Sequence, residues 1–176
     1  MAIGATIYKA ELNIADMDRH YYHQHDLTVA MHPSENAFRL MARIIVFAHN
    51  ASEQLTFTKG LSTDDEPDLW SKSLSDEIDL WIDFGQVDEK RIRKACGRAK
   101  QVRIYTYDNR KADIWWQQTA GKLKRHDNLS LYHLHTNALE TLIDRKMQLQ
   151  CQIQDDEIYI SNGTIDLTVR VETRDK

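Results

Sequence analysis

The sequence predicts an α+β fold in which a mixed β-sheet is flanked by helices. Hydrophobic residues alternate near the N-terminus as in a β-hairpin, the middle of the chain has the order helix, strand, strand, helix, strand, and further short strands follow. The chain has 176 residues, 41% of them hydrophobic and 28% charged, which is enough for one domain with its own core. We therefore expect a single domain over residues 1–176.

The first third of the chain predicts a hairpin followed by a helix. Residues 5–14 alternate as in a strand, a polar turn follows at 16–19, and a second strand contains Leu27, Val29 and Met31. The segment His32-Pro33-Ser34-Glu35 then opens a helix that runs to about Asn50, with Ser34 as its expected N-cap.

The remaining elements follow from shorter patterns of the same kinds. Strands are expected at 55–59, 77–85, 101–107 and 129–133, and helices at 88–100, 112–119 and 138–145. The chain ends in a meander whose Asn162-Gly163 pair favours a hairpin turn.

Several classes of protein are disfavoured by what the sequence lacks. Cys96 and Cys151 are too few for a disulfide scaffold, and we expect both to be small buried residues. The N-terminus has no signal-peptide pattern, and no apolar stretch approaches the roughly 20 residues that cross a bilayer. We expect a cytoplasmic protein without membrane contact.

Two adjacent blocks of opposite charge are hidden behind the overall net charge of −4. Residues 62–89 contain ten acidic residues and one basic residue, whereas residues 90–126 contain twelve basic and two acidic residues. Clustered carboxylates can hold Mg²⁺, and a basic surface beside them can hold phosphates. This combination suits metal-assisted phosphodiester cleavage. The alternative is that the two blocks neutralise each other and stay solvated.

The carboxylates of the acidic block are of two kinds. Asp64, Asp65, Glu66 and Asp68 surround Pro67, which favours an exposed turn or a helix start, and most of them are expected to be solvated or to cap a helix. Asp79 and Asp83 instead lie within an apolar strand, four residues apart, and so share one face with Trp81. We expect both to be more than half buried. Buried carboxylates need a partner, either a metal ion or an Arg or Lys of the next helix.

Cations and histidines supply the other candidate groups. Lys90 and Lys94 are four residues apart, so they share one face of the helix at 88–100. Glu35, Arg39 and Arg43 fall on one face of the first helix, where a solvated salt bridge between Glu35 and Arg39 is the alternative to a site. The pairs His23/His25 and His133/His135 can ligate zinc, but exposed strand histidines are the favoured interpretation.

Several motifs, in order along the chain, resemble the YaeQ family. They are Ala5–Ala10, His32–Glu35, Phe57–Leu61, Asp64–Pro67 with Trp70, Ile78–Asp83, Arg91–Cys96, Ile114–Gln118 and Gln152–Asp155. The resemblance implies a fold similar to the PD-(D/E)XK nucleases, with an added N-terminal hairpin and C-terminal strands. In that fold Glu35, Asp79 and Asp83 look like the metal-binding acids. One departure matters, because Gly85 stands where the strand lysine is expected.

Two functions of different classes follow from this resemblance. The first is a nuclease or phosphodiesterase that acts on DNA or RNA. Its Mg²⁺ or Mn²⁺ would be held by Glu35, Asp79 and Asp83, with Asp79, Asp83, Lys90 and Lys94 in catalysis and Arg91, Arg98 and Lys100 on phosphates. The second is a nuclease-like domain without catalysis that binds nucleic acid or a protein partner. Arginine side chains bound to Asp79 and Asp83 would favour this second function, binding without catalysis.

Overall fold

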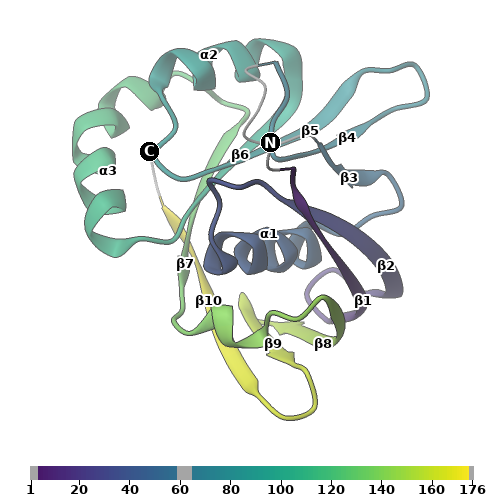
Figure 1. Cartoon of the computed structure of the whole chain (residues 1–176). Coiled ribbons are helices and arrows are strands. Elements are labelled where there is room, and N and C mark those ends of the chain that lie inside the picture. Colours follow the sequence, from purple (N-terminus) through teal and green to yellow (C-terminus); the bar gives the residue numbers. More distant parts are fainter. Residues whose placement is uncertain (1–3, 59–64, 175–176) are drawn as a thin grey trace. The chain divides into compact units, whose positions relative to one another are not determined.

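The computed structural model describes residues 4–58 and 65–174, and the chain divides into two compact units (Figure 1). Unit 1 comprises Met1–Ala51 and Thr136–Val171, and unit 2 comprises Ser52–His135 and Glu172–Lys176. Helices and mixed sheets are both present, so the predicted α+β class is confirmed. The single domain over the whole chain stays a prediction.

Unit 1 is built on five strands in the order β2-β1-β8-β9-β10. Its elements are β1 (Thr6–Asp16), β2 (Tyr21–Met31), α1 (Ala37–Asn50), the 3₁₀ helix η2 (Leu139–Leu142), β8 (Lys146–Gln154), β9 (Glu157–Ser161) and β10 (Asp166–Arg174), the last three residues of which belong to unit 2. Neighbouring strands are antiparallel except β1 and β8, which are parallel. The predicted N-terminal hairpin is confirmed.

Alternation of side chains decides which face of this sheet is buried. Along β8 every second residue from Met147 to Ile153 is buried, while the residues between them point outward. Strand β1 follows the same rule, with Leu12 and Ile14 buried. Helix α1 packs against β1, β2 and η2.

Three local predictions for unit 1 can be compared with the structure, and one of them is confirmed. The N-cap of α1 is Asn36, whose side chain accepts a hydrogen bond from the Arg39 N–H, so the prediction that Ser34 caps the helix is wrong. The helix expected at 138–145 is only a 3₁₀ turn at Leu139–Leu142. The Asn162-Gly163 turn is confirmed, and Gly163 adopts a φ of 92°, which glycine tolerates.

Unit 2 contains a second run of five strands in the order β7-β6-β5-β4-β3. Its elements are β3 (Leu55–Phe57), β4 (Leu69–Lys72), β5 (Ile78–Phe84), α2 (Glu89–Arg98), β6 (Ala99–Thr106), α3 (Asn109–Leu123) and β7 (Leu129–His135). The β3–β4 and β4–β5 pairs are antiparallel, and the β5–β6 and β6–β7 pairs are parallel. Trp81, Ile92, Val102 and Leu129 meet in its core.

Unit 2 departs from prediction in its element boundaries. Strand β4 was not predicted, and α3 is nearly twice as long as the expected 112–119. It begins earlier because Asp108 caps it by accepting a hydrogen bond from the Lys111 N–H, and it continues to Leu123. Strand β3 ends at Phe57, and the predicted end of that strand at Lys59 lies outside the described residues.

Candidate functional site

Strand β5 carries the carboxylates that the sequence singled out. Asp79, Trp81 and Asp83 are two residues apart along the strand and so share one face. Trp81 belongs to the same core cluster as Ile92 of α2. The Asp83 side chain is 4% exposed and that of Asp79 is 42% exposed. Both are more than half buried, as expected, but only Asp83 is enclosed.

Asp83 is fully occupied by hydrogen-bond donors from its own unit. Arg91 of α2 donates from Nε to Oδ2 at 2.9 Å and from Nη2 to Oδ1 at 3.1 Å. Trp81 Nε1 donates to Oδ2 at 2.9 Å. The same Arg91 Nη2 donates to the Glu66 carbonyl at 2.8 Å, which ties the segment before β4 to α2. An arginine of the next helix, one of the two partners expected for this carboxylate, therefore contacts both of its oxygens.

Asp79 has a looser partner near the start of β6. Lys100 Nζ lies 3.2 Å from Asp79 Oδ1 and 3.3 Å from Glu77 Oε2. The two carboxylates raise the pKa of Lys100, chiefly through its hydrogen bonds to Asp79 and then Glu77. Lys100, expected on phosphate, is thus an exposed ion-pair partner of the acidic block.

Glu35 lies in unit 1, just before α1, and its two arginine partners come from that unit. Arg39 Nη1 and Arg43 Nη2 lie 2.5 and 2.6 Å from its two carboxylate oxygens. The Glu35 side chain is 2% exposed. The expected salt bridge between Glu35 and Arg39 is confirmed, but the prediction that it lies on a solvated face is wrong, because Glu35 is buried and shared by two arginines.

These contacts bear on the metal expected from the family resemblance. Glu35, Asp79 and Asp83 each have Arg or Lys nitrogens on their oxygens. Among residues 4–58 and 65–174, no group of three or more His, Cys, Asp or Glu is arranged to hold a metal ion. As they stand, the three acids do not fit a divalent cation.

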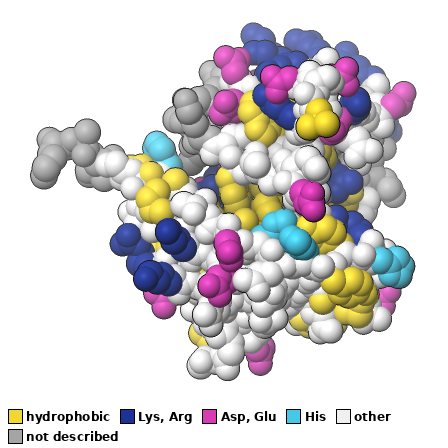
Figure 2. All heavy atoms as spheres, turned by 90° about the vertical axis from the view of Figure 1, so that its right-hand side faces the viewer, with side chains coloured by type: hydrophobic (Ala, Val, Ile, Leu, Met, Phe, Trp, Pro, Cys, Tyr) yellow, Lys and Arg dark blue, Asp and Glu magenta, His cyan; other side chains and the backbone are white. Residues whose placement is uncertain are grey.

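The basic residues of α2 form an exposed stripe. Lys90, Lys94 and Arg98 are spaced by four residues and are all exposed. Lys94 Nζ lies 3.1 Å from Asp65 Oδ1, and Arg98 Nη1 donates to the Asp65 carbonyl at 2.8 Å. Figure 2 shows lysine and arginine side chains gathered at the top of the view, where α2 lies in Figure 1.

Ion pairs join the two charge blocks that the sequence revealed. Lys94 with Asp65, Lys100 with Glu77 and Asp79, Arg91 with Asp83, and Arg125 with Glu89 all cross from one block to the other. Mutual neutralisation, the alternative to a cleavage site, accounts for these contacts.

Sequence reasoning missed Asp68, which was expected in an exposed turn. Asp68 is 6% exposed, and its N–H donates to the Ile82 carbonyl at 3.0 Å. Leu69 pairs with Ile82, so the preceding Asp68 lies next to Asp83 on the neighbouring strand. In the sequence, the Pro67-Asp68 pair was the feature that could have singled out Asp68. Asp64, from the same predicted turn, lies outside the described residues.

Of the histidine pairs, His23 is exposed as expected, whereas His133 is not. His133 is completely buried, with Nδ1 2.6 Å from Thr106 Oγ1 and Nε2 2.6 Å from Asn109 Oδ1. Its neighbour His135 contacts Glu172. Burial, and then the charges of Arg174 and His135, lower the pKa of His133 to about 4. The prediction of an exposed strand histidine is wrong for His133. In the other pair, His25 Nε2 lies 2.7 Å from Tyr21 Oη.

The cysteines match their predicted burial in one of two cases. Cys151 is 2% exposed, and burial raises the pKa of its thiol to about 12. Cys96 is only half-buried, on the edge of the unit 2 core. No helix within the described part of the chain is long and apolar enough to cross a membrane.

A sequence model of the family described as YaeQ protein matches residues 1–171. The chain belongs to the YaeQ family. It is 44% identical over 174 residues to an uncharacterized YaeQ protein of Escherichia coli (strain K12), covering 97% of this chain and 96% of that one. The YaeQ protein of Salmonella typhi shows the same identity and coverage.

Two crystal structures of YaeQ proteins share this fold. That from Xanthomonas axonopodis pv. citri matches with a TM-score of 0.93 and 43% identity, over 97% of this chain and 98% of that one. That from Pseudomonas syringae matches with a TM-score of 0.91 and 30% identity, over 98% and 97%. The YaeQ resemblance read from the motifs is therefore confirmed.

Proposed function

We propose that this member of the YaeQ family binds the phosphate backbone of nucleic acid along the exposed face of α2 and does not cleave it. Two features support the proposal. The chain has a PD-(D/E)XK-like order of elements, and the oxygens of Asp83 are bonded to Arg91. The proposed function is the second of the two functions that the sequence left open.

The order and direction of the elements support a PD-(D/E)XK-like core. Along the chain, α1 precedes the antiparallel strands β3, β4 and β5, and α2 then connects β5 to the parallel strand β6. The helix before a mixed sheet, with acids on a central strand, is the arrangement that the family resemblance implies.

The Arg91–Asp83 contact carries the non-cleaving half of the proposal. A bidentate guanidinium bonds to both oxygens of the carboxylate that a cation would need. The contact is 4% exposed on the aspartate side, so releasing Arg91 would leave a buried charge without its partner. Gly85, at the expected lysine position, removes the strand cation that would activate water.

The basic stripe carries the binding half. Lys90, Lys94 and Arg98 are exposed along one face of α2. Lys94 contacts the carboxylate of Asp65, which is 80% exposed, and Arg98 donates to the Asp65 carbonyl. Exposed ion pairs stabilise a protein by less than about 1 kcal/mol, so a phosphate can replace Asp65 at little cost. Phosphate contacts of this kind give affinity without sequence specificity.

The test is fluorescence anisotropy with labelled single-stranded and duplex oligonucleotides over a series of salt concentrations. Binding should weaken linearly with salt on a log–log plot. Changing Lys90, Lys94 and Arg98 together to Gln should flatten the duplex slope by about 0.9 for each lost phosphate contact. A matched triple variant in unit 1, with Lys9, Lys146 and Arg170 changed to Gln, should keep the wild-type slope. Equal slopes for both variants would sink the proposal.

A second candidate, metal-dependent cleavage, is favoured by the position of Asp68 beside Asp83. Pro67-Asp68 resembles the Pro-Asp pair for which the PD-(D/E)XK fold is named. This function requires Arg91 to leave Asp83. It predicts that Arg91→Ala cleaves the oligonucleotides when Mn²⁺ is supplied, and that adding Asp68→Asn abolishes the cleavage. Cleavage by the wild-type protein that Asp83→Asn abolishes would overturn the non-cleaving proposal.

A further inference from the structure

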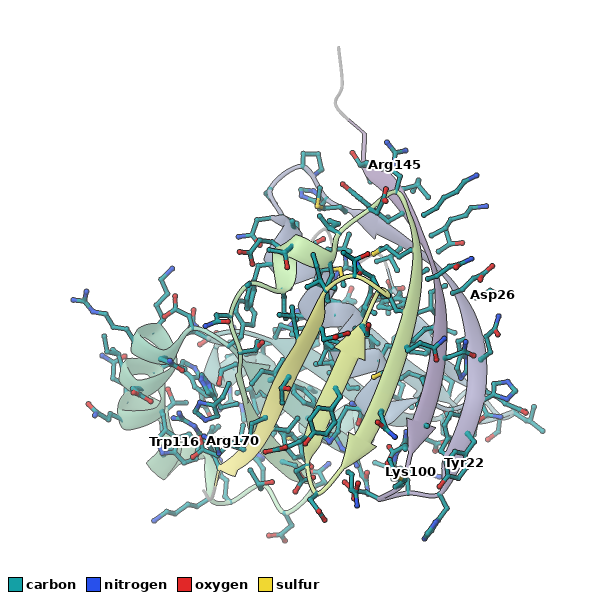
Figure 3. The ribbon with its side chains drawn as sticks, turned by 90° about the horizontal axis from the view of Figure 1, so that it is seen from below. Tyr22, Asp26, Lys100, Trp116, Arg145 and Arg170 are labelled. Atoms are coloured by element: carbon teal, nitrogen blue, oxygen red, sulfur yellow. The ribbon has the colours of Figure 1, made fainter. Side chains whose placement is uncertain are left out.

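The outward face of the unit 1 sheet carries side chains in ordered rows that the proposed function does not use. Strand register places residues opposite one another across β2, β1, β8, β9 and β10, and Figure 3 shows these strands side by side. One row runs Tyr22, Ala15, Gln152, Tyr159, Thr168, and the next runs Gln24, Asn13, Gln150, Ser161, Asp166.

A hollow of about 640 Å³ opens over these two rows. Tyr22 and Tyr159, 60% and 44% exposed, stand on either side of it. Ala15, between them, is too small to fill the space. The backbones that carry the two rings are three strand spacings apart, about 14 Å. Two exposed aromatic rings at that separation can contact an extended ligand at two points. A ligand made of a single small ring is too short to reach both tyrosines.

The polar groups around the hollow are amides and hydroxyls. Asn13, Gln150 and Gln152 offer both donors and acceptors, and Ser161 and Thr168 add hydroxyls of the same dual character. Each can pair with a ligand hydroxyl whichever way that hydroxyl points. A ligand rich in hydroxyl groups is therefore better matched than one that only donates or only accepts.

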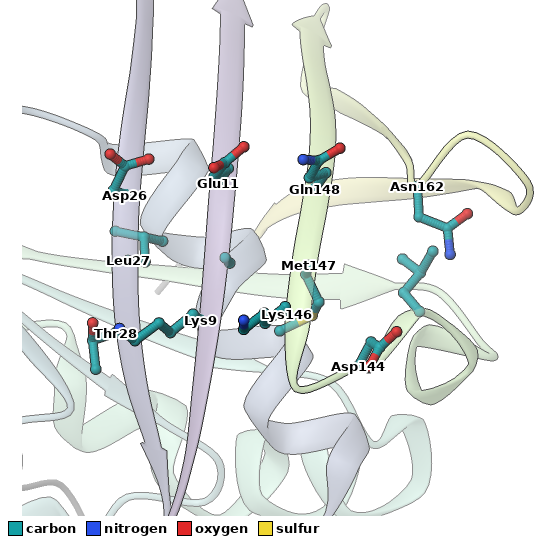
Figure 4. A pocket seen from close by; sticks show the side chains of 12 residues that line it. Lys9, Glu11, Asp26, Leu27, Thr28, Asp144, Lys146, Met147, Gln148 and Asn162 are labelled. Carbon is teal, nitrogen blue, oxygen red and sulfur yellow. The ribbon is translucent and has the colours of Figure 1, made fainter.

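Charge separates the possible ligands. The described residues that line the hollow include no Lys or Arg, and they include the carboxylate of Asp166. A phosphate there would meet one like charge and no opposite charge, so a nucleic-acid strand is disfavoured. Farther along the face, Figure 4 shows a row of Asp26, Glu11 and Gln148 beside a row of Thr28, Lys9 and Lys146. Acids and bases alternate there and favour no one sign of charge.

We propose that this hollow binds a neutral oligosaccharide, whose sugar rings stack on Tyr22 and Tyr159 and whose hydroxyls bond to the amides between them. Aromatic side chains supply a large apolar contact at a small entropic cost, and the C–H face of a sugar ring is apolar. The site lies in unit 1, so it is independent of the phosphate contacts proposed for α2.

The experiment is a ¹H–¹⁵N NMR titration of the full chain with cellohexaose, maltohexaose and chitohexaose at millimolar concentrations. At least one should shift amide signals of the two rows with a saturable curve. Tyr22→Ala and Tyr159→Ala should each weaken that binding about tenfold, equivalent to about 1.4 kcal/mol, whereas Tyr22→Phe should retain it because the ring remains. Ile7→Ala removes an exposed apolar side chain elsewhere on the face and is the matched control.

Three outcomes would overturn the inference. They are no shift with any of the three sugars, equal weakening by Ile7→Ala, and saturable binding of oligo(dT) at the same two tyrosines. A thermal unfolding midpoint within error of wild type for Tyr22→Ala shows that lost binding is not lost folding. This is expected because the side chain is mostly exposed.

Discussion

Arg91 and Asp83 form a two-point contact, in which Nε and Nη2 of the arginine lie 2.9 and 3.1 Å from the two oxygens of the aspartate. The arginine comes from α2 and the aspartate from β5, so the contact fixes the helix over the strand. It also decides what the carboxylate can do. Both oxygens of Asp83 accept hydrogen bonds from Arg91, which is the reason we propose that Asp83 is not a metal ligand.

Removing one partner of this contact should destabilise the protein more than removing an exposed ion pair. Arg91→Ala should lower the free energy of unfolding by about 3 kcal/mol, because Asp83 remains buried without its charge partner. Lys94→Ala, which breaks the exposed pair with Asp65, should change it by less than about 0.5 kcal/mol. Urea unfolding measures both. The double variant Arg91→Met, Asp83→Leu should recover part of the loss, and equal effects of the two single variants would contradict the account.

The first helix offers a matched pair of capping variants. Asn36→Ala should lower the free energy of unfolding by about 1 kcal/mol, because the Arg39 N–H loses its acceptor. Ser34→Ala should have less than about half that effect, since Ser34 is exposed and its hydroxyl is hydrogen-bonded to the His32 ring rather than to a helix N–H. Urea unfolding of both variants decides between them. A larger loss for Ser34→Ala would restore the cap expected from sequence.

His133 should make stability depend on pH. Its pKa is lowered from 6.5 to about 4 by burial, and by the charges of Arg174 and His135, against weaker opposite effects of Glu172 and Asp113. The native state therefore holds the ring neutral, while the unfolded chain takes up a proton below pH 6.5. This contribution is fully present above pH 6.5 and is lost as the pH falls to about 4, by about 3 kcal/mol in all.

The measurement is the free energy of unfolding across that pH range for wild type and His133→Gln. The difference between their pH dependences isolates His133 from the carboxylates that titrate nearby. His20→Gln, at an exposed turn position, is the control and should follow the wild-type curve. Parallel curves for wild type and His133→Gln would refute this assignment.

An element of the fold could be predicted where it is long enough to show a pattern of hydrophobic residues along the sequence. Alternation of side chains predicted the N-terminal hairpin, because a period of two needs only a few residues. The strand around Asp83 was predicted from its apolar run of β-branched and aromatic residues. The four-residue strand β4 was missed, since Leu69–Lys72 is too short to show a period. The 3₁₀ turn at Leu139–Leu142 looked helical because its apolar residues have helical spacing.

The sequence identified residues of the candidate site, but it did not predict which of them contact one another. Sequence placed Asp83 and a run of cations close together, yet it left open whether metal or arginine held the carboxylate. That choice depends on where the Arg91 side chain ends in space, which strand and helix periods do not encode. Asp68 was assigned to a solvated turn because acids next to proline usually lie there, and only pairing of β4 with β5 brings it beside Asp83.

The most direct test of the central claim is thermal unfolding with Mn²⁺ or with chelator, for wild type and Asp83→Asn. A cation that binds only the native state raises the midpoint by mass action. Because Arg91 holds both oxygens of Asp83, wild type should unfold at the same midpoint in Mn²⁺ and in chelator, and so should Asp83→Asn at its own lower midpoint. A rise with Mn²⁺ in wild type that is absent in Asp83→Asn would contradict the account, because Asp83 would then be a metal ligand.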